Sequence, residues 1–478
     1  MVKMIESDVC VVGGGLAGLS AALMAAESGL KTVVLERNEA EDYLCNSRMT
    51  GGAFHICLTD ILSDESLLEQ KIMGATEGSV NPALARAMAV DTKRAVRWLQ
   101  SHGIRFIKGG AEAHHNFVLS PPSLQRVGSE WKGRGGDVLL RTLAAELAKF
   151  GGAILRGHRA TELVVDGGRC VGLRGSRGDE EFQVRATAVV IADGGYQCDP
   201  AILREGISPA PEKLLQRNAK SGHGDGLRMA RAAGARLTEL VGFYGHVMNR
   251  DALTNDKLWP LPWMDNVATS AIVVDGQGKR FLDEGRGGVY IANGIAAMQD
   301  PLSTTVIFDQ PLWDGPGSSR FLPPNPHMEN CGGTVIKTAT LGELAQRLGL
   351  PADALMETVA GYNAAIESGS LESLDPPRNP RAYRPYPIST GPFYAVPVCA
   401  GITYTMGGIA IDEWGRALRG DGSAFPGLYA AGGSTGGLEG GRSVGYLGGL
   451  AKAATTGMRA GQHIAQQRKD QAVGAGTA

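Results

Sequence analysis

The stretch "SDVCVVGGGLAGLSAALMAAESGLKTVVLER" (residues 7–37) decides the fold of this chain. Its apolar runs and glycines predict a strand over 8–12, a glycine turn, a helix over 16–28 and a second strand over 31–35. A strand, a helix and a second strand within so few residues form a compact βαβ unit, so the chain begins as an α/β protein.

Gly13, Gly15 and Gly18 in this unit match the spacing GxGxxG. The first glycine permits a tight turn, the second lets the backbone approach a pyrophosphate, and the third lets helix and strand pack closely. The helix N-terminus offers unpaired N–H groups to the phosphates. Glu36, at the end of the second strand, can bond a ribose, so the unit predicts a dinucleotide site.

Composition limits the remaining possibilities. A chain of 478 residues with 43% hydrophobic and 20% charged residues is typical of a globular protein too long for one ordinary core. The net charge of -2 gives no electrostatic reason to expect nucleic acid or an anionic membrane as partner. The seven cysteines are scattered without a CxxC motif, which indicates reduced thiols. We therefore expect a cytoplasmic protein with a small-molecule substrate, without a signal peptide, a membrane span or a metal site.

Three later segments resemble further parts of a dinucleotide site. "ATAVVIADGG" (186–195) and "PGLYAAGGSTGG" (426–437) each read as a strand ending in small residues. "SGHGDGLRMARAAGARL" (221–237) reads as a glycine turn that opens a helix, with Asp225 at the cap position. Strand ends that converge on one crevice form the cofactor site of a doubly wound sheet. No second GxGxxG follows a strand, so the set favours FAD over a separate NAD(P) domain.

An ordered set of motifs resembles one flavoprotein superfamily over residues 5–465. The motifs are "VVGGGLAGLSAA", "CNSRMTGGAF", "VVIADGG", "SGHGDG", "GKRFLDE", "GITYTMGGIAID", "PGLYAAGG" and "GYLGGLAKA". They resemble the fumarate reductase/succinate dehydrogenase flavoproteins, which include 3-ketosteroid Δ1-dehydrogenases and the tricarballylate dehydrogenase group. The resemblance implies an α/β fold with a Rossmann-like FAD-binding domain of the glutathione-reductase type, interrupted by an α+β capping domain.

The resemblance also implies domain limits and cofactor contacts. The FAD-binding domain is expected over 1–241 and 405–468, the cap over 242–404, and a flexible tail over 469–478. "TLGELAQRLGL" and "PADALMETVAGYNAAIESG" have helical spacing and are predicted as helices of the cap. The residues expected to bind FAD non-covalently are Gly13, Gly15, Leu16, Ala17, Gly18, Glu36, Arg37, Asn46, Ser47, Arg48, Thr50, Gly51, Gly52, Ala192, Asp193, Gly194, Asp225, Gly226, Gly407, Gly432, Gly433, Gly448, Gly449 and Leu450. Gly433 stands where the superfamily usually has an acid that holds the ribityl chain.

Three positions separate this chain from the fumarate reductases that it resembles. Those enzymes have Arg, His and Arg where this chain has Tyr446, Tyr404 and Gly288. Arginine forks bind a dicarboxylate bidentately, whereas phenols cannot neutralise two negative charges. A fumarate reductase is therefore not expected.

The ketosteroid dehydrogenases have a tyrosine at the position of Tyr446, where the phenol polarises a substrate ketone. With the N–H groups around Gly449 and Leu450, Tyr446 is predicted to form an oxyanion hole. Tyr290 or Tyr404 is the predicted base, and either needs a lowered pKa or a proton relay.

Four further residues have alternative interpretations. His246 either contacts the substrate or packs in the cap. Arg286 and Arg442 either bind a substrate carboxylate or lie on the surface, which is the more common place for arginine. Tyr244 is interpreted as a core residue.

The sequence predicts an FAD-dependent dehydrogenase that introduces a C=C bond beside a ketone. Its substrate is expected to be a 3-ketosteroid or, because the chain is short for that group, a smaller ring such as an oxocyclohexanecarboxylate. Two alternatives stay open: an ene-reductase or tricarballylate-type enzyme, and a flavoprotein electron carrier. The sequence does not identify the electron acceptor.

Overall fold

The βαβ unit forms where the sequence predicts it. In the computed structural model of the chain, which describes residues 2–124, 129–319, 322–379 and 383–476, the unit consists of β2 (Val9–Val12), α1 (Leu16–Glu27) and β3 (Thr32–Glu36). Every residue of both strands is buried, and most are β-branched or apolar, as expected for a parallel sheet covered on both faces.

β2 and β3 lie within a six-stranded sheet that is parallel apart from its edge strand. Its order is β20 (Arg416–Leu418), β21 (Ala424–Ala430), β12 (Ala188–Ile191), β2, β3 and β8 (Ala153–Arg156), and β20 is antiparallel to β21. The strands predicted within 186–195 and 426–437 are therefore neighbours of each other, and β12 is also a neighbour of β2. Their carboxyl ends meet at one edge, which is where a doubly wound sheet binds its ligand.

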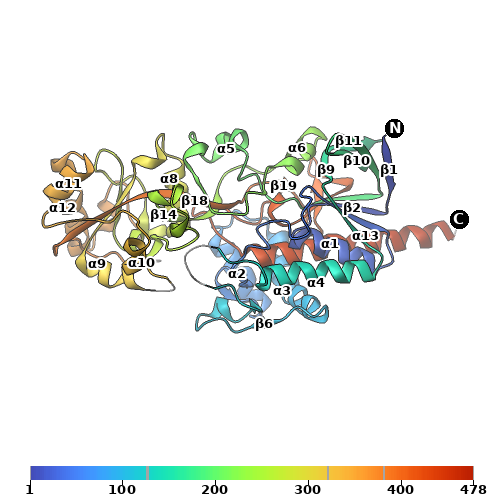
Figure 1. Cartoon of the computed structure of the whole chain (residues 1–478), viewed down its shortest axis with the longest axis horizontal. Coiled ribbons are helices and arrows are strands. Elements are labelled where there is room, and N and C mark those ends of the chain that lie inside the picture. The colour runs from blue at the N-terminus through green and yellow to red at the C-terminus, as the bar shows by residue number, and fades with distance from the viewer. Residues whose placement is uncertain (1, 125–128, 320–321, 380–382, 477–478) are drawn as a thin grey trace.

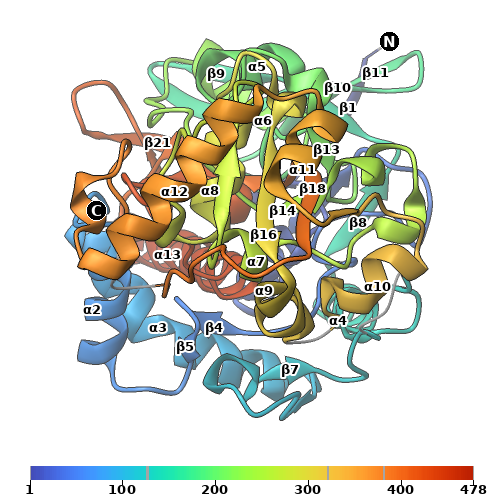
Figure 2. The same cartoon turned by 90° about the vertical axis from the view of Figure 1, so that its left-hand side faces the viewer.

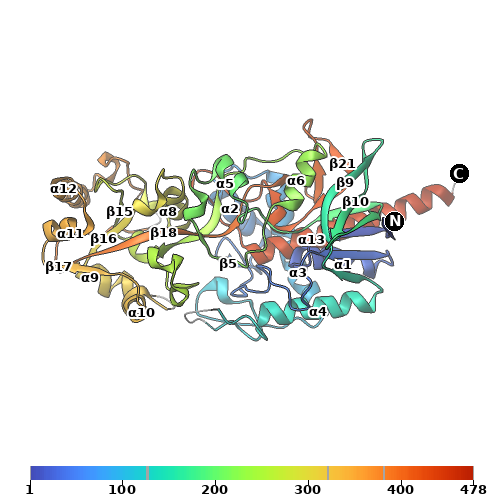
Figure 3. The same cartoon turned by 45° about the horizontal axis from the view of Figure 1, so that its top comes forward.

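Helices pack on this sheet, and a smaller sheet adjoins it. α13 (Gly449–Gly476) lies along α1, and a Cβ added to Gly457 would lie 2.3 Å from the Ala17 carbonyl oxygen, so glycine permits this close approach (Figure 3). α13 also continues through residues 469–476, where the sequence predicts a tail. The smaller sheet has the strand order β1 (Lys3–Glu6), β11 (Glu180–Arg185), β10 (Arg169–Arg177) and β9 (Arg159–Asp166). The remaining helices of this part are α2 (Glu65–Ala75), α3 (Pro82–Ser101), α4 (Gly135–Lys149), α5 (Pro200–Gly206) and α6 (Asp225–Ala232).

A third sheet is built on the 13-residue strand β18 (Phe393–Thr405). β18 extends from the far left of the molecule toward its centre (Figures 1 and 3). Its partners are β13 (Leu215–Gln216), β14 (Phe243–Asn249), β16 (Thr305–Asp309) and β17 (Ile336–Thr338), and β16 also pairs with β15 (Ile272–Val274).

The helices of this end include both that the sequence predicts. Figure 2 faces them, with α11 (Leu341–Leu348) and α12 (Ala352–Ser368) in front of β14, β16 and β18. The others are α7 (Asp265–Ala268), α8 (Gly288–Ala296), α9 (Gln310–Asp314) and α10 (Pro324–Asn330). None of the helices in the described ranges combines the length and the apolarity that crossing a membrane requires.

The end of β18 connects the third sheet to the ligand-binding edge of the first. Thr405 Oγ1 accepts a hydrogen bond from the Tyr196 amide, 3.1 Å away, just after β12. Asn46 Nδ2 donates to the Thr403 carbonyl at 2.9 Å. Side chains at the end of β18 are thereby placed beside the glycine turn. The division into domains at residues 241/242 and 404/405 stays a prediction.

Candidate active site

The glycine turn between β2 and α1 is shaped by close backbone contacts. Gly13 has a φ of +100°, and an added Cβ would lie 2.6 Å from the Ala192 carbonyl oxygen. A Cβ on Gly18 would lie 2.0 Å from the Gly13 carbonyl oxygen. Gly15 differs, because its nearest neighbour would be Ser47 Oγ at 3.6 Å. The protein thus leaves space at Gly15, where the motif requires a pyrophosphate to approach.

Glu36 holds this turn through its carboxylate. Oε2 accepts the Gly14 amide at 3.0 Å and Oε1 accepts the Asn38 amide at 2.9 Å. Burial raises the pKa of Glu36. Leu16 N donates to Ser47 Oγ at 3.1 Å, so the predicted loop 46–52 is in contact with the start of α1. These positions fit a dinucleotide held against the end of β3.

Asp193 joins three of the predicted segments at the end of β12. It accepts the Gly226 amide at 2.7 Å and the Ser434 hydroxyl at 3.1 Å. Burial raises its pKa to about 6. Gly194 beside it has a φ of +91°, and an added Cβ would meet no atom within 4 Å. The open positions at Gly15 and Gly194 flank the same edge, which fits an extended FAD molecule.

The prediction that Asp225 caps a helix is wrong by one residue. Gly224, with a φ of +68°, is the N-cap of α6, and Asp225 lies in the first turn. Its carboxylate accepts hydrogen bonds from three arginines, Arg37, Arg159 and Arg228. Left-handed backbone at the cap favours glycine, which leaves Asp225 to neutralise the arginines.

Other predicted FAD residues make structural contacts. Arg48 forms a buried ion pair with Asp137, and both side chains are 2% exposed. A Cβ on Gly407 would lie 2.3 Å from the Glu239 carbonyl oxygen, so this glycine is required by protein packing. Gly432 N donates to Thr456 Oγ1 at 2.9 Å.

Beyond the turn, three tyrosines from distant segments form one aromatic group, here called the phenol cluster: Tyr244 in β14, Tyr404 in β18 and Tyr446 before α13. The rings of Tyr244 and Tyr446 stack at 3.9 Å with 14° between their planes. Tyr404 lies 5.7 Å from Tyr244 and 6.3 Å from Tyr446, between ring centroids. The sequence interpretation of Tyr244 as a core residue missed this stacking, because its partner is about 200 residues away along the chain.

Tyr446 points its phenol at the start of α13. The Gly449 amide donates to the Tyr446 hydroxyl oxygen at 3.3 Å, so the phenol and the predicted N–H donor are adjacent. Burial and the nearby Tyr244 raise the pKa of Tyr446 well above its usual value. The phenol therefore stays protonated and can donate a hydrogen bond to a carbonyl oxygen. His55, 5.5 Å from the Tyr446 ring, has a pKa lowered to about 3 by burial and stays neutral.

Tyr404 is bonded to a buried ion pair. Its hydroxyl donates to Glu439 Oε1 at 2.6 Å, and Lys452 Nζ donates to Glu439 Oε2 at 2.9 Å. The side chains of Glu439 and Lys452 are 0% and 1% exposed. Burial and then Glu439 raise the pKa of Tyr404 well above its usual value. The raised pKa means that Tyr404 cannot act as a phenolate base. Its hydrogen bond to Glu439 instead provides the proton relay that a neutral phenol needs in order to act as a base.

His246 lies between a carboxylate and the phenol cluster. Nδ1 is 2.6 Å from Asp265 Oδ2 and Nε2 is 3.1 Å from the Tyr244 hydroxyl. Its ring lies 3.7 Å from that of Trp263, between centroids. Burial lowers the pKa of His246 despite the carboxylate. His246 is thus well placed to orient the Tyr244 hydroxyl.

Tyr290 and the two predicted arginines form a separate group. Arg286 donates to Asp283 at 3.2 Å and to Ser443 at 3.0 Å, and its guanidinium lies 5.4 Å from the Tyr290 ring centroid. Arg442 is exposed. Among the described residues, Tyr290 makes no ring contact with the phenol cluster, so Tyr404 is the better-placed of the two predicted bases.

Sequence reasoning missed Glu439, Asp265 and Arg217. Glu439 had a detectable signal, because it is the one acid in the glycine-rich stretch 436–450. Asp265 and Arg217 belong to no motif. The pairing of β13 with β18 brings Arg217 to the cluster, and Asp265, at the start of α7, reaches it through His246 and the Val247 amide of β14.

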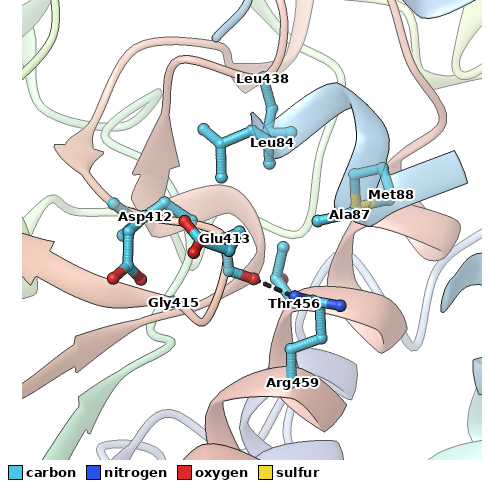
Figure 4. A pocket seen from close by; sticks show the side chains of 10 residues that line it. Leu84, Ala87, Met88, Asp412, Glu413, Gly415, Leu438, Thr456 and Arg459 are labelled. Atoms are coloured by element: carbon cyan, nitrogen blue, oxygen red, sulfur yellow. Dashed lines mark hydrogen bonds between the residues drawn. The ribbon is translucent and has the colours of Figure 1, made fainter. Parts of the chain in front are cut away.

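A small cavity of about 10 Å³ is lined by none of the three tyrosines of the phenol cluster (Figure 4). Its lining includes Leu84, Met88 and Arg459, and Arg459 is paired with Asp91. A space of this size holds no more than about one water molecule. It is therefore not a substrate site.

Known proteins match nearly the whole chain. A family model described as an FAD binding domain matches residues 8–445. Fumarate reductase (cytochrome) from Shewanella frigidimarina is 27% identical over 481 residues, which cover 97% of this chain and 77% of that protein. The 4-oxocyclohexanecarboxylate 2-dehydrogenase of Sinomonas cyclohexanicum is 31% identical over 366 residues, covering 70% of this chain and 61% of that protein.

Solved structures share the fold. The crystal structure of 3-ketosteroid-delta4-(5alpha)-dehydrogenase from Rhodococcus jostii RHA1, in complex with 4-androstene-3,17-dione, superposes with a TM-score of 0.71. The match covers 96% of this chain and 97% of that one at 23% sequence identity. A likeness at this identity establishes the shared architecture.

Proposed function

The chain belongs to the FAD-binding domain family and is an FAD-dependent oxidoreductase acting on CH–CH groups, and from this premise we propose that it introduces a C=C bond beside a ketone. The observation that carries the proposal is the contact between the Tyr446 hydroxyl and the Gly449 amide within the phenol cluster. When bound, FAD accepts the hydride that leaves the carbon β to the carbonyl.

Tyr446 and Gly449 polarise the ketone in this proposal. The Tyr446 hydroxyl and the Gly449 amide both act as hydrogen-bond donors at the start of α13. A substrate ketone oxygen that takes the place of their bond to each other accepts one hydrogen bond from each. Such donors stabilise the negative charge that develops on oxygen as the α-proton leaves. The helix N-terminus adds a favourable dipole.

Tyr404 and Glu439 take up the α-proton. The substrate C–H proton passes to the Tyr404 oxygen while the Tyr404 proton passes to Glu439 Oε1, so the phenol never carries a full charge. Glu439 becomes neutral, and Lys452 keeps its contact with Oε2. The electron pair of the broken C–H bond forms the new C=C bond as the β-hydride departs.

A second candidate function is reduction of a C=C bond by the same groups in reverse. The raised pKa of Tyr404 favours it, because a protonated phenol bonded to a buried ion pair can return a proton to carbon. The tyrosine at position 446 counts against fumarate as that substrate, since a phenol cannot neutralise a carboxylate.

Anaerobic mixing with candidate substrates tests the two directions. We expect 4-oxocyclohexanecarboxylate or a saturated 3-ketosteroid to bleach the flavin of the oxidised holoprotein. Bleaching by no ketone, together with reoxidation of the photoreduced protein by an enone, would favour the reductase.

Substitutions of the phenols test their roles. Tyr446→Phe should retain FAD and slow bleaching about 10²–10³-fold, the usual effect of losing one oxyanion donor. Tyr404→Phe should slow it about 10²–10⁴-fold while leaving the Glu439–Lys452 pair intact. Tyr394→Phe is the matched control, because its hydroxyl bonds Gln310 far from the cluster. Unchanged bleaching in Tyr446→Phe would remove that phenol from the mechanism.

A further inference from the structure

Among the described residues, Arg217 is an arginine beside the phenol cluster that has no carboxylate partner. The buried arginines of the described chain are each paired with an acid: Arg48 with Asp137, Arg280 and Arg378 with Glu284, and Arg459 with Asp91. Arg217 is half-buried, and in the described residues no carboxylate oxygen lies within salt-bridge distance of it. A partly buried cation without a counterion is costly unless something supplies one.

The backbone fixes where this guanidinium lies. Arg217 directly follows β13, and its amide donates to the Ile402 carbonyl at 2.8 Å, which extends the pairing with β18. Nε donates to the Pro260 carbonyl and Nη1 to Thr403 Oγ1, both at 3.1 Å. Both acceptors are neutral, so they position the guanidinium and do not compensate its charge.

The guanidinium faces the proposed reaction site. Its charge interacts with Tyr244, Asp265 and Tyr446, and burial lowers its pKa. Its carbon lies 5.3 Å from the centroid of the Trp263 ring. Asp265 is occupied by His246 and by the Val247 amide at 2.8 Å, so it is not free to pair with Arg217.

We infer that Arg217 is a specificity residue that binds a carboxylate on the substrate. The inference rests on the proposed function and names its substrate class: a small cyclic or unsaturated oxo-acid rather than a neutral steroid. Both N–H groups on Nη2 have no acceptor among the described residues, which leaves one side of the fork for a planar carboxylate. A guanidinium without a carboxylate partner among the described residues matches a single negative charge, which an oxo-acid carries and a neutral steroid does not.

This arrangement differs from the arginines that the sequence singled out. Arg286 is already neutralised by Asp283 and contacts Glu77, and Arg442 is exposed. The cation that selects an acidic substrate in our inference is therefore Arg217, which β13 holds in place.

Calorimetric titration of the oxidised holoprotein with cyclohexanecarboxylate and with its amide tests the residue apart from turnover. We expect wild type to prefer the carboxylate. Arg217→Gln should weaken carboxylate binding at least about 30-fold while leaving amide binding unchanged, as for loss of one partner of a buried charge pair. Arg217→Lys should give an intermediate affinity, because lysine keeps the charge without the fork.

Arg250→Gln is the matched control, since Arg250 is also half-buried and donates to a carbonyl, that of Leu302. Its carboxylate preference should equal that of wild type. Equal loss of carboxylate and amide binding in Arg217→Gln, or no preference in wild type, would overturn the inference. If carboxylate binding depends on Arg217 but 4-oxocyclohexanecarboxylate fails to bleach the flavin, the proposed oxidation fails and the carboxylate site stands.

Discussion

Two glycine-rich segments, residues 13–18 and 436–450, look alike in sequence but are glycine-rich for different reasons. Gly13 and Gly18 make close contacts within the βαβ unit and its neighbouring strand β12. In the second segment, a Cβ on Gly445 would lie 2.1 Å from the Ala75 carbonyl oxygen, and one on Gly448 would lie 2.3 Å from that of His55. The partners of the second set are thus hundreds of residues away, and many of its glycines accommodate other backbone rather than a ligand.

A high density of glycines therefore predicts that another group comes close to the backbone, but it does not tell whether that group is protein backbone or a ligand. A local motif carries its own partners within a few turns of chain, so its geometry can be read directly. A glycine whose partner comes from another segment can be interpreted only when the fold is known. Three predictions sharpen the contrast.

Gly18→Ala should have the largest effect on FAD binding. The added methyl would overlap the Gly13 carbonyl oxygen, which is backbone and cannot move aside. We expect purified protein that lacks FAD and is destabilised by about 1–3 kcal/mol, measured by the flavin-to-protein absorbance ratio and by denaturation. Gly361→Ala in α12, where an added Cβ meets no atom within 4 Å, is the control and should be neutral or stabilising. Full FAD occupancy in Gly18→Ala would contradict the packing role.

The second prediction concerns the stability contributed by Asp193 beside the same turn. Its pKa is raised from 3.8 to about 6, so the folded state retains a proton that the unfolded state releases. The resulting stabilisation is fully present below about pH 3.8 and is lost as pH rises through about 6, a change of about 3 kcal/mol. Asp193→Asn should remove this slope.

Denaturation of both proteins at several pH values between about 4 and 7 measures the difference. Asp166→Asn, an exposed aspartate at the end of β9, serves as the control. Parallel pH profiles for wild type and Asp193→Asn would show that folding does not raise the pKa of this carboxyl.

Gly445→Ala should have the smallest effect on FAD binding. Its methyl would press on the Ala75 carbonyl and displace the loop that carries Tyr446. We expect full FAD binding but about 10- to 100-fold slower flavin bleaching by substrate, as for a misplaced catalytic group. Gly74→Ala, beside the same contact but with no atom within 4 Å of its added Cβ, should bleach at the wild-type rate. Loss of FAD in Gly445→Ala would mean that this segment supports the cofactor directly.

Much of the fold follows from local sequence, and part of the site does not. The order of the first strands and the helices α11 and α12 could be predicted because apolar periodicity is a local property. The predicted N-cap of α6, Asp225, is wrong by one residue because the cap position has a left-handed backbone, which Gly224 adopts. The sequence could not decide which of Tyr290 and Tyr404 is the base, because both are tyrosines near the expected site. Only the pairing of β14 with β18 places Tyr404 beside Tyr446.

By itself, the sequence predicted that a glycine turn between two buried strands binds FAD, and that a tyrosine takes the position of an arginine in the fumarate reductases that the chain resembles. The tertiary structure decided the rest. The pairing of β13 and β14 with β18 brought Arg217, Tyr244 and Tyr404 beside Tyr446, and the approach of α13 placed Lys452 against Glu439. These contacts depend on sheet register and helix packing between distant segments, which no local pattern of residues encodes.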